Sequence, residues 1–314
     1  MFKPFQQFIA SSPDFAVICH HRPDGDAIGS LLSLGCYLEG LGKKIGLYCF
    51  DSIPAYLNFL PGTERIKKEC DDFWQAVSSV ILVDCGDLAM VGGPADCLKG
   101  KRLAVIDHHI SNPRYGEVNL IDPQVSATTE LLGRFFQAMN FGIDKNLATC
   151  LLTGLYTDTD AFSNLATTPE ALSMASLLLK QGANFKEITA NTLQNKSIPA
   201  LKLWGRALER LRLDTEKGIA VTVIRDSDLI ECQAQVEDTE GIASLLNHLA
   251  DVKMSMVLRE QGDGTVKGSL RTTNELIDVS KIAKLLGGGG HMKAAGFLVK
   301  GHVLETEKGW KIVE

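Results

Sequence analysis

The 314-residue sequence has no long apolar run, no CxxC motif and no excess of basic residues. No stretch approaches the ~18 apolar residues of a transmembrane helix, and the N-terminal segment lacks the charged flank and cleavage site of a secretory signal. Several of the eight cysteines lie in apolar runs, where a free thiol behaves as a small buried hydrophobe. Because disulfide frameworks belong to small secreted domains, we expect a reduced, cytoplasmic protein without a membrane span.

The sequence also lacks the broad basic surface that binds long nucleic acids. Its net charge of −6 argues against a protein that coats long duplexes. The charge is uneven, because residues 253–300 contain eight Lys/Arg and four Asp/Glu, a local balance of +4 that leaves −10 for the rest. A short, highly charged anion held between an acidic half and a basic half fits this distribution.

Strand-like and helix-like patterns alternate in the first half of the chain. Continuous apolar runs predict buried strands at residues 15–20, 44–50, 78–87 and 101–109. Helix patterns cover residues 27–42, 126–140 and 145–162. Ser126 is the expected N-cap of the second of these helices, with Glu130 just inside it. The alternation predicts an α/β domain whose mostly parallel sheet is covered by helices on both faces.

The pattern changes near residue 191, in keeping with the roughly two domains that this length favours. A polar stretch and a long amphipathic helix form the candidate linker, residues 191–214, between a domain at 1–190 and a domain at 215–314. Strand patterns in the second half lie at 218–224, 252–260 and 265–272, and helix patterns at 241–250 and 279–288. The second half therefore predicts a smaller α+β domain.

Carboxylates and histidines gather where the predicted strands and helices of the first half end. Ligands of open α/β sheets bind outside the carboxyl ends of the strands. A final pair of carboxylates closes the segment that we expect to be the last helix of this half. The candidates are His20, Asp24, Asp26, Asp84, Asp107, His108, His109, Asp158 and Asp160.

Several carboxylates in one crevice repel each other unless cations neutralise them. Mixed carboxylate and imidazole ligands favour Mn²⁺ over Ca²⁺, with Mg²⁺ and Zn²⁺ as alternatives. The candidate ligands outnumber the needs of one ion. Two ions ~3.5–4 Å apart that share a bridging carboxylate are used in phosphoester hydrolysis. The sequence therefore predicts a two-metal phosphohydrolase.

At these residues the sequence resembles the DHH phosphoesterase superfamily. HHRPDGDAIGS is similar to its first motif, VDCGD to its second, DHH to its third and TDTDAF to its fourth. GSLRT and GGGGHMKAAGF resemble the DHHA1 domain that accompanies one branch. The resemblance covers nearly the whole chain. Length and domain pairing are most similar to the oligoribonuclease branch of the NrnA type, also described as phosphatases of phosphoadenosine phosphate (pAp).

The resemblance implies a role for each candidate. The implied ligands are His20 and Asp24 for one ion, Asp26, His108 and Asp158 for the other, and Asp84 as the bridge between them. His109 would point at the substrate phosphate, while Asp107 would orient the histidines. Asp160 is expected to be structural, and Asp122 stays open.

Four successive glycines, Gly287–Gly290, follow a predicted helix, which excludes the Rossmann fingerprint, and no Walker motif is present. Two interpretations stay open. The glycines extend a helix C-cap, or they let backbone N–H groups approach an anion. On the second interpretation a terminal phosphate is bound by the bidentate fork of Arg271 together with Gly288, Gly289, Gly290 and His291.

We therefore predict a Mn²⁺-dependent phosphohydrolase that degrades oligoribonucleotides of two to five nucleotides to mononucleotides and converts pAp to AMP. Hydrolysis of linear or cyclic dinucleotides is the main alternative. RecJ-like exonuclease, pyrophosphatase and exopolyphosphatase activities are less favoured. A non-catalytic nucleotide sensor on the same scaffold is the alternative from another class. The oligomeric state, including a homodimer, stays open.

Overall fold

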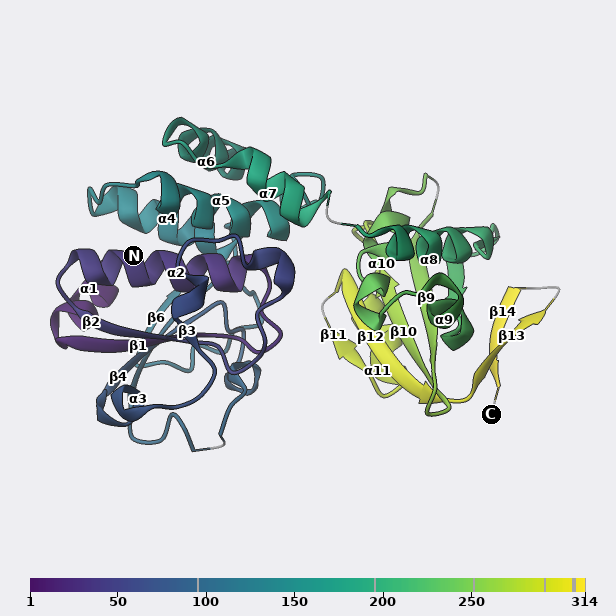
Figure 1. The fold of residues 1–314 in the computed structure, drawn as a ribbon, viewed down its shortest axis with the longest axis horizontal. Coiled ribbons are helices and arrows are strands. Elements are labelled where there is room, and N and C mark those ends of the chain that lie inside the picture. Colours follow the sequence, from purple (N-terminus) through teal and green to yellow (C-terminus); the bar gives the residue numbers. More distant parts are fainter. Residues whose placement is uncertain (95, 195, 251, 291, 307–308, 314) are drawn as a thin grey trace. The chain divides into compact units, whose positions relative to one another are not determined.

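The computed structural model describes residues 1–314 apart from 95, 195, 251, 291, 307–308 and 314. The chain divides into two compact units, residues 1–195 and 196–314. Figure 1 labels most of the helices and strands of both units. Each unit contains its own six-stranded sheet, so each is described by itself.

The first unit is built on a parallel sheet with the strand order β3-β2-β1-β4-β5-β6. Its strands are β1 (Asp14–Cys19), β2 (Lys44–Tyr48), β3 (Ile66–Lys67), β4 (Ser79–Val83), β5 (Arg102–Asp107) and β6 (Val118–Ile121). Along β1, Phe15 and Val17 pack into one buried cluster, while Ala16 and Ile18 pack into another on the opposite face. Burial on both faces explains the continuous apolar runs of the sequence.

Helices cover both faces of this sheet, which confirms the predicted fold class. They are α1 (Lys3–Ala10), α2 (Gly25–Gly40), α3 (Asp72–Ala76), α4 (Thr128–Ala138), α5 (Lys145–Asp158), α6 (Pro169–Lys180) and α7 (Phe185–Thr192). Figure 1 shows α2, α4 and α5 on one side of the sheet and α3 on the other. The expectation that α5 is the last helix of this half is wrong, because α6 and α7 follow it and pack with it in the same unit.

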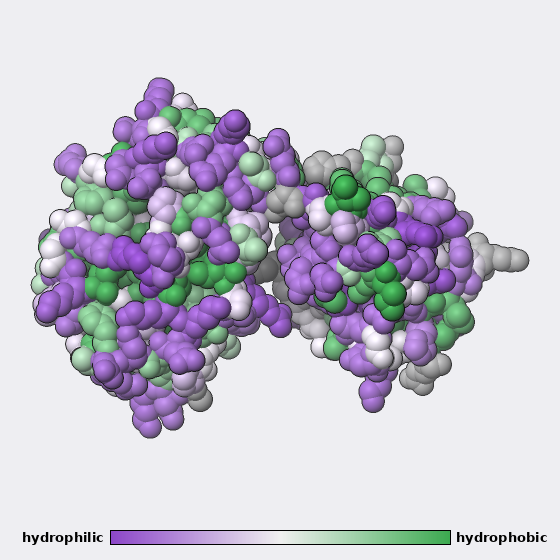
Figure 2. Space-filling view, viewed as in Figure 1, coloured by the Kyte–Doolittle hydropathy of each residue, from purple (hydrophilic) through white to green (hydrophobic). Residues whose placement is uncertain are grey.

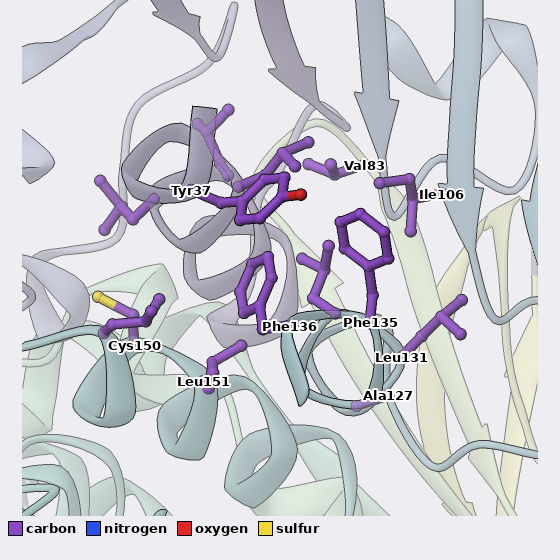
Figure 3. Close-up of a cluster of buried hydrophobic side chains, with 14 of the residues drawn as sticks. Tyr37, Val83, Ile106, Ala127, Leu131, Phe135, Phe136, Cys150 and Leu151 are labelled. Carbon is purple, nitrogen blue, oxygen red and sulfur yellow. The ribbon is translucent and has the colours of Figure 1, made fainter. Parts of the chain in front are cut away.

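Aromatic side chains of α2 and α4 form the centre of the larger buried cluster (Figure 3). The ring of Tyr37 lies edge-on to Phe135 and stacked on Phe136, with 5.1 Å between the centroids in each pair. Such pairs contribute about 0.5–1.5 kcal/mol each beyond the burial of area. They fix the position of α4 against α2, and with it the position of the first turn of α4.

Glycines let α2 pack closely against α5 and α4. A Cβ atom on Gly29 would lie 2.6 Å from the carbonyl oxygen of Cys150. A Cβ atom on Gly154 would lie 2.5 Å from Thr129 Cγ2 and 2.7 Å from Asp26 Oδ1. Since real Cβ atoms avoid such distances, only glycine allows this packing. The packing brings the N-terminus of α2 to the C-terminus of α5.

The second unit contains a mixed sheet with the strand order β11-β12-β10-β9-β8-β7, in which β8 and β9 are parallel and the other pairs antiparallel. Its strands are β7 (Arg212–Asp214), β8 (Ile219–Ile224), β9 (Met254–Gln261), β10 (Thr265–Arg271), β11 (Gly289–Gly290) and β12 (Ala294–Lys300), followed by the hairpin β13 (His302–Thr306) and β14 (Gly309–Val313). Its helices are α8 (Ile198–Glu209), α9 (Asp226–Cys232), α10 (Ile242–Leu245) and α11 (Val279–Leu285).

Helix α8 lies inside the segment predicted as a linker. Its residues Leu203 and Ala207 are buried in a cluster with Ile224 and Val257 of the second unit. Helix α11 packs into a separate cluster with Leu258, Val266 and Leu270 of β9 and β10. Because Val257 and Leu258 are neighbours on one strand, α8 and α11 cover opposite faces of the sheet.

Hydrophilic and hydrophobic residues are interspersed on the visible face of each unit (Figure 2). In the part of the chain that the structure describes, no helix combines the length and the apolar character needed to cross a bilayer. The eight cysteines are all free thiols, as the sequence predicts.

The α2–α5 packing gives a stability prediction. We expect Gly154→Ala to destabilise the protein by about 1–3 kcal/mol, because the added methyl group forces Thr129 and Asp26 to move. Gly205→Ala is the control, since Gly205 is an exposed helical position where a Cβ atom would meet nothing within 4 Å. It should stabilise by about 0.5–1 kcal/mol. Calorimetric unfolding measures both, and equal effects would contradict the packing described.

Candidate metal centre and active site

Three neighbouring strands end at one edge of the parallel sheet, and each leads into a candidate ligand. Strand β1 ends directly before His20, β4 ends directly before Asp84, and β5 ends at Asp107. Strand β4 pairs with both β1 and β5, so these residues lie side by side at the edge where α/β proteins bind ligands. Asp84 has a φ of 57°, a left-handed conformation that is uncommon outside glycine and is found at functional sites.

The first turn of α2 adds two carboxylates to this edge. Asp24 is the N-cap of α2, and its Oδ1 accepts hydrogen bonds from the N–H groups of Asp26 and Ala27, both at 3.0 Å. The fully buried Asp26 reaches the first turn of α4. Its carboxylate accepts hydrogen bonds from Thr128 N–H at 2.6 Å and Thr129 N–H at 2.9 Å.

The expectation that Ser126 caps α4 is therefore wrong. The N-cap residue is Ala127, and the first N–H groups of the helix are satisfied by Asp26 from another helix. The hydroxyl of Ser126 donates instead to the carbonyl oxygen of Ala166. A carboxylate at this helix end is also favoured by the helix dipole.

Asp84 lies between two of the predicted histidine ligands. His20 Nε2 lies 3.4 Å from Asp84 Oδ2 and 3.8 Å from Asp24 Oδ1. His108 Nε2 lies 3.7 Å from Asp84 Oδ1 and 3.3 Å from Asp158 Oδ2. The fold therefore brings together side chains from four separated segments of the sequence.

Three overlapping groups of ligand atoms result, and the atoms of each group lie within 4.8 Å of one another. The groups are His20, Asp24 and Asp84; Asp84, His108 and His109; and Asp26, His108 and Asp158. All six predicted metal ligands belong to them. Carboxylates and imidazoles at these separations are a donor set that suits a borderline divalent ion.

The electrostatics of the cluster fit a cation. Burial, followed by the negative charge of Asp84, raises the pKa of Asp26 to about 7. Burial and the charge of Asp26 raise the pKa of Asp158 well above its usual range. Burial opposes protonation of His20, yet its close contacts with Asp24 and Asp84 raise its pKa to about 11. The protein's own carboxylates thus repel one another, and positive charge among them removes the repulsion.

Asp107 forms hydrogen bonds with both neighbouring histidines, His108 and His109. The buried carboxylate accepts hydrogen bonds from the backbone N–H of His108 at 2.9 Å and from Nδ1 of His109 at 2.7 Å. Asn112 Nδ2 donates to the other carboxylate oxygen at 2.6 Å and also contacts the carbonyl oxygen of Cys85 at 3.1 Å. Asp107 therefore contacts the side chain of His109 and the backbone of His108.

Sequence reasoning missed Asn112, Thr128 and Thr129. The hydroxyl of Thr128 donates to Asp84 Oδ1 at 3.0 Å, and that of Thr129 donates to Asp26 Oδ1 at 2.6 Å. The available signals were the amide five residues after Asp107 and two adjacent hydroxyl residues in the first turn of a predicted helix.

The four glycines Gly287–Gly290 of the second unit differ in whether packing requires them. A Cβ atom on Gly288 would lie 2.1 Å from the carbonyl oxygen of Gly296, and Gly290 has a φ of 135° with close backbone neighbours in β12. Packing against β12 therefore explains both. A Cβ atom on Gly287 or Gly289 would meet nothing within 4 Å, so close packing does not explain the glycines at these two positions. His291 lies outside the described residues.

Arg271 is the last residue of β10, and its guanidinium lines a hollow in the second unit. Its Nη1 donates to the carbonyl oxygen of Leu270 at 2.9 Å. The side chain is therefore anchored at a half-buried position on the sheet face.

A parallel α/β unit with clustered Asp and His side chains at its carboxyl edge, followed by a mixed-sheet unit, defines an α/β protein with a candidate metal centre. Residues 14–155 match the model of the DHH family, N-terminal domain, and residues 213–308 match that of the DHHA1 domain. The chain is 33% identical over 285 residues to the bifunctional oligoribonuclease and PAP phosphatase NrnA of Thermus thermophilus, covering 91% of this chain and 84% of that protein. The chain belongs to the DHH phosphoesterase family, in the branch with a DHHA1 domain.

Other relatives extend the comparison. The cyclic-di-AMP phosphodiesterase GdpP of Geobacillus thermodenitrificans is 28% identical over 308 residues, which cover 92% of this chain and 45% of that protein. The crystal structure of an exopolyphosphatase-related protein from Bacteroides fragilis superposes with a TM-score of 0.88 at 25% identity, covering 94% of this chain and 90% of that one. The family resemblance found in the sequence is confirmed.

Protons and metal ions compete for the clustered carboxylates and imidazoles, which gives a pH prediction. A carboxyl whose pKa is raised on folding, such as Asp26, makes the folded protein less stable as the pH rises from about 4 to about 7. A divalent cation favours the ionised form and reverses this loss. The rise in Tm caused by Mn²⁺, relative to EDTA, should therefore be larger at pH 8 than at pH 6. A Mn²⁺-induced rise in Tm that is smaller at pH 8 than at pH 6 would contradict this prediction.

Proposed function

We propose that this chain is a two-metal, Mn²⁺-dependent phosphohydrolase that degrades oligoribonucleotides of two to five nucleotides to mononucleotides and converts pAp to AMP. The observation that carries the proposal is the position of Asp84, 3.4 Å from His20 and 3.7 Å from His108. One carboxylate thus belongs to two groups of ligand atoms, as a bridge between two ions requires. The substrate class is supported by the similarity to NrnA.

Each ion has its own set of residues in this proposal. The sets are His20 and Asp24 for the first ion, Asp26, His108 and Asp158 for the second, and Asp84 for both. Mixed oxygen and nitrogen donors favour Mn²⁺, with Mg²⁺ as the alternative. When bound, the ions would activate water and offset negative charge on the phosphoryl oxygens. The hydroxyl of Thr128, 3.0 Å from Asp84 Oδ1, limits how the bridging carboxylate can turn.

His109 contacts the substrate phosphate in this proposal. Burial opposes its protonation, but the hydrogen bond with Asp107 raises the pKa of His109 above its ordinary value. This favours protonation of the ring, and a cationic ring is suited to a phosphoryl oxygen. Asp107 fixes Nδ1 as the donor and so sets the orientation of the ring.

The second unit supplies substrate-binding residues. Arg271 binds the phosphate that is not cleaved, since its fork matches phosphate geometry. The backbone at Gly289 and the neighbouring Gly288, Gly290 and His291 complete this part of the site. We also propose a cytoplasmic location, which the eight free cysteines support.

Hydrolysis of linear or cyclic dinucleotides is the second candidate, and the similarity to GdpP favours it. The same ligand groups serve this reaction, so the difference lies in which substrate is bound. A non-catalytic sensor is disfavoured, because all six candidate ligands are present and lie in three connected groups.

A substrate panel decides between these functions. Pure protein is incubated with Mn²⁺ and, in separate assays, with pAp, RNAs of two to five nucleotides, an RNA of 24 nucleotides or a cyclic dinucleotide. The kcat/KM values for these substrates are then compared. We expect pAp and the shortest RNAs to be best and the longest RNA to be poorest. A higher value for the cyclic dinucleotide would establish the second candidate, while tight binding without product would establish a sensor.

The TDTD segment offers a matched pair of variants. Asp158→Asn should lower kcat/KM by more than about 100-fold, because even partners that only orient ligands typically contribute 10–100-fold. Asp160→Asn should leave activity within about twofold. Asp160 is exposed and has a φ of 49°, a conformation that asparagine adopts readily. Equal losses in both variants would mean that the segment matters for structure and not for metal binding.

A further inference from the structure

A hollow of about 350 Å³ lies within the second unit, against the face of β9 and β10 that α11 does not cover. The segment 239–244 forms its other wall. Its size is within the range of ligand-binding pockets. The residues of β9 and β10 that line it are Val257, Arg259, Lys267, Ser269 and Arg271.

Three of these residues carry positive charge on the same face of the sheet. Lys267 and Arg271 are four positions apart on β10, so their side chains share a face. The strand register places Lys267 directly opposite Arg259 of β9. Like charges that face each other across an antiparallel pair are destabilising. A bound anion would turn this unfavourable pair into a favourable arrangement.

The other groups around the hollow suit a nucleotide. The hydroxyl residues Thr239 and Ser244 lie opposite the cations, and Ile224 adds an apolar surface. Glu240 is the carboxylate in the lining, and it is exposed. Arg259 is held in place because its Nη2 donates to Gln261 Oε1 at 2.8 Å.

We propose that the hollow is a subsite for an internucleotide phosphate of the bound oligoribonucleotide. Lys267 and Arg259 bind this phosphate, which lies beyond the phosphate bound at Arg271. The inference rests on the proposed function and deepens it, because it makes Lys267 and Arg259 determinants of chain length. A nucleotide such as pAp has two phosphates and therefore none to place there, whereas a chain of three nucleotides with a 5′-phosphate has a third.

Binding of two probes to the full-length protein in Mn²⁺ tests the subsite without turnover. The probes are a labelled 5′-phosphorylated tri-adenylate with phosphorothioate links and a labelled pAp analogue whose phosphates are replaced by phosphorothioates, so that both resist cleavage while binding is measured. Lys267→Gln should weaken tri-adenylate binding about tenfold. It should also reduce the salt dependence, the slope of log Kd against log salt, by roughly 0.7, since one phosphate contact is lost on a single strand. Binding of pAp should be unchanged, which also shows that the variant is folded.

Two further variants complete the design. Lys281→Gln removes the same charge from α11 on the opposite face, where its side chain is 81% exposed, and should change neither probe. Lys267→Arg should restore tri-adenylate binding. The inference is overturned if Lys267→Gln and Lys281→Gln behave alike, even when the enzyme cleaves short RNA normally. Lys267-dependent binding without cleavage of any RNA would uphold the subsite and overturn the proposed function.

Discussion

The carboxylate of Asp26 joins helices that lie about a hundred residues apart in the sequence. It starts in the first turn of α2 and accepts the N–H groups of Thr128 and Thr129 at the start of α4. The absence of a side chain at Gly154 lets α5 approach the same carboxylate. One buried group therefore sets the relative positions of three helices. The side chains at their ends meet the ends of β1, β4 and β5 only because this junction forms.

The junction also creates an electrostatic conflict. Asp26 is favoured by the N-terminal dipole of α4, but Asp158 lies at the C-terminal end of α5, where the dipole opposes a carboxylate. Burial makes the conflict worse, which is why the pKa of both groups is raised. Bound divalent cations would resolve it more fully than protons do, because they would neutralise the carboxylates while leaving them ionised. Metal binding would therefore be linked to the stability of this unit.

The sequence alone predicted β1, β2, β4 and β5 of the first unit and placed the ligand candidates at the ends of predicted elements, because apolar runs of this length are local properties. It did not predict the short strands β3 and β6 or the helices α3, α6 and α7. The sequence did not predict the roles of Thr128 and Asn112, and the reason is physical. Their roles depend on carboxylates that reach them through the tertiary fold, and the local pattern of a helix start or a turn is the same without such a partner. The Ser126 error has the same origin, since the cap that α4 uses comes from α2 and not from the preceding residue.

In the second unit, some residues of the glycine-rich and GSLRT motifs are needed for packing, and others are available to bind a ligand. Gly288 and Gly290 are required by the close approach of β12, so their presence says little about a ligand. Side chains that stand on the sheet face, Arg271 and the opposed pair Lys267 and Arg259, are not required by packing in this way, and the opposed charges are unfavourable without an anion. On the proposal above, substrate choice depends on this face. Relatives with the same metal ligands and different substrates are expected to differ here, because the first unit's chemistry is common to every phosphoester it meets.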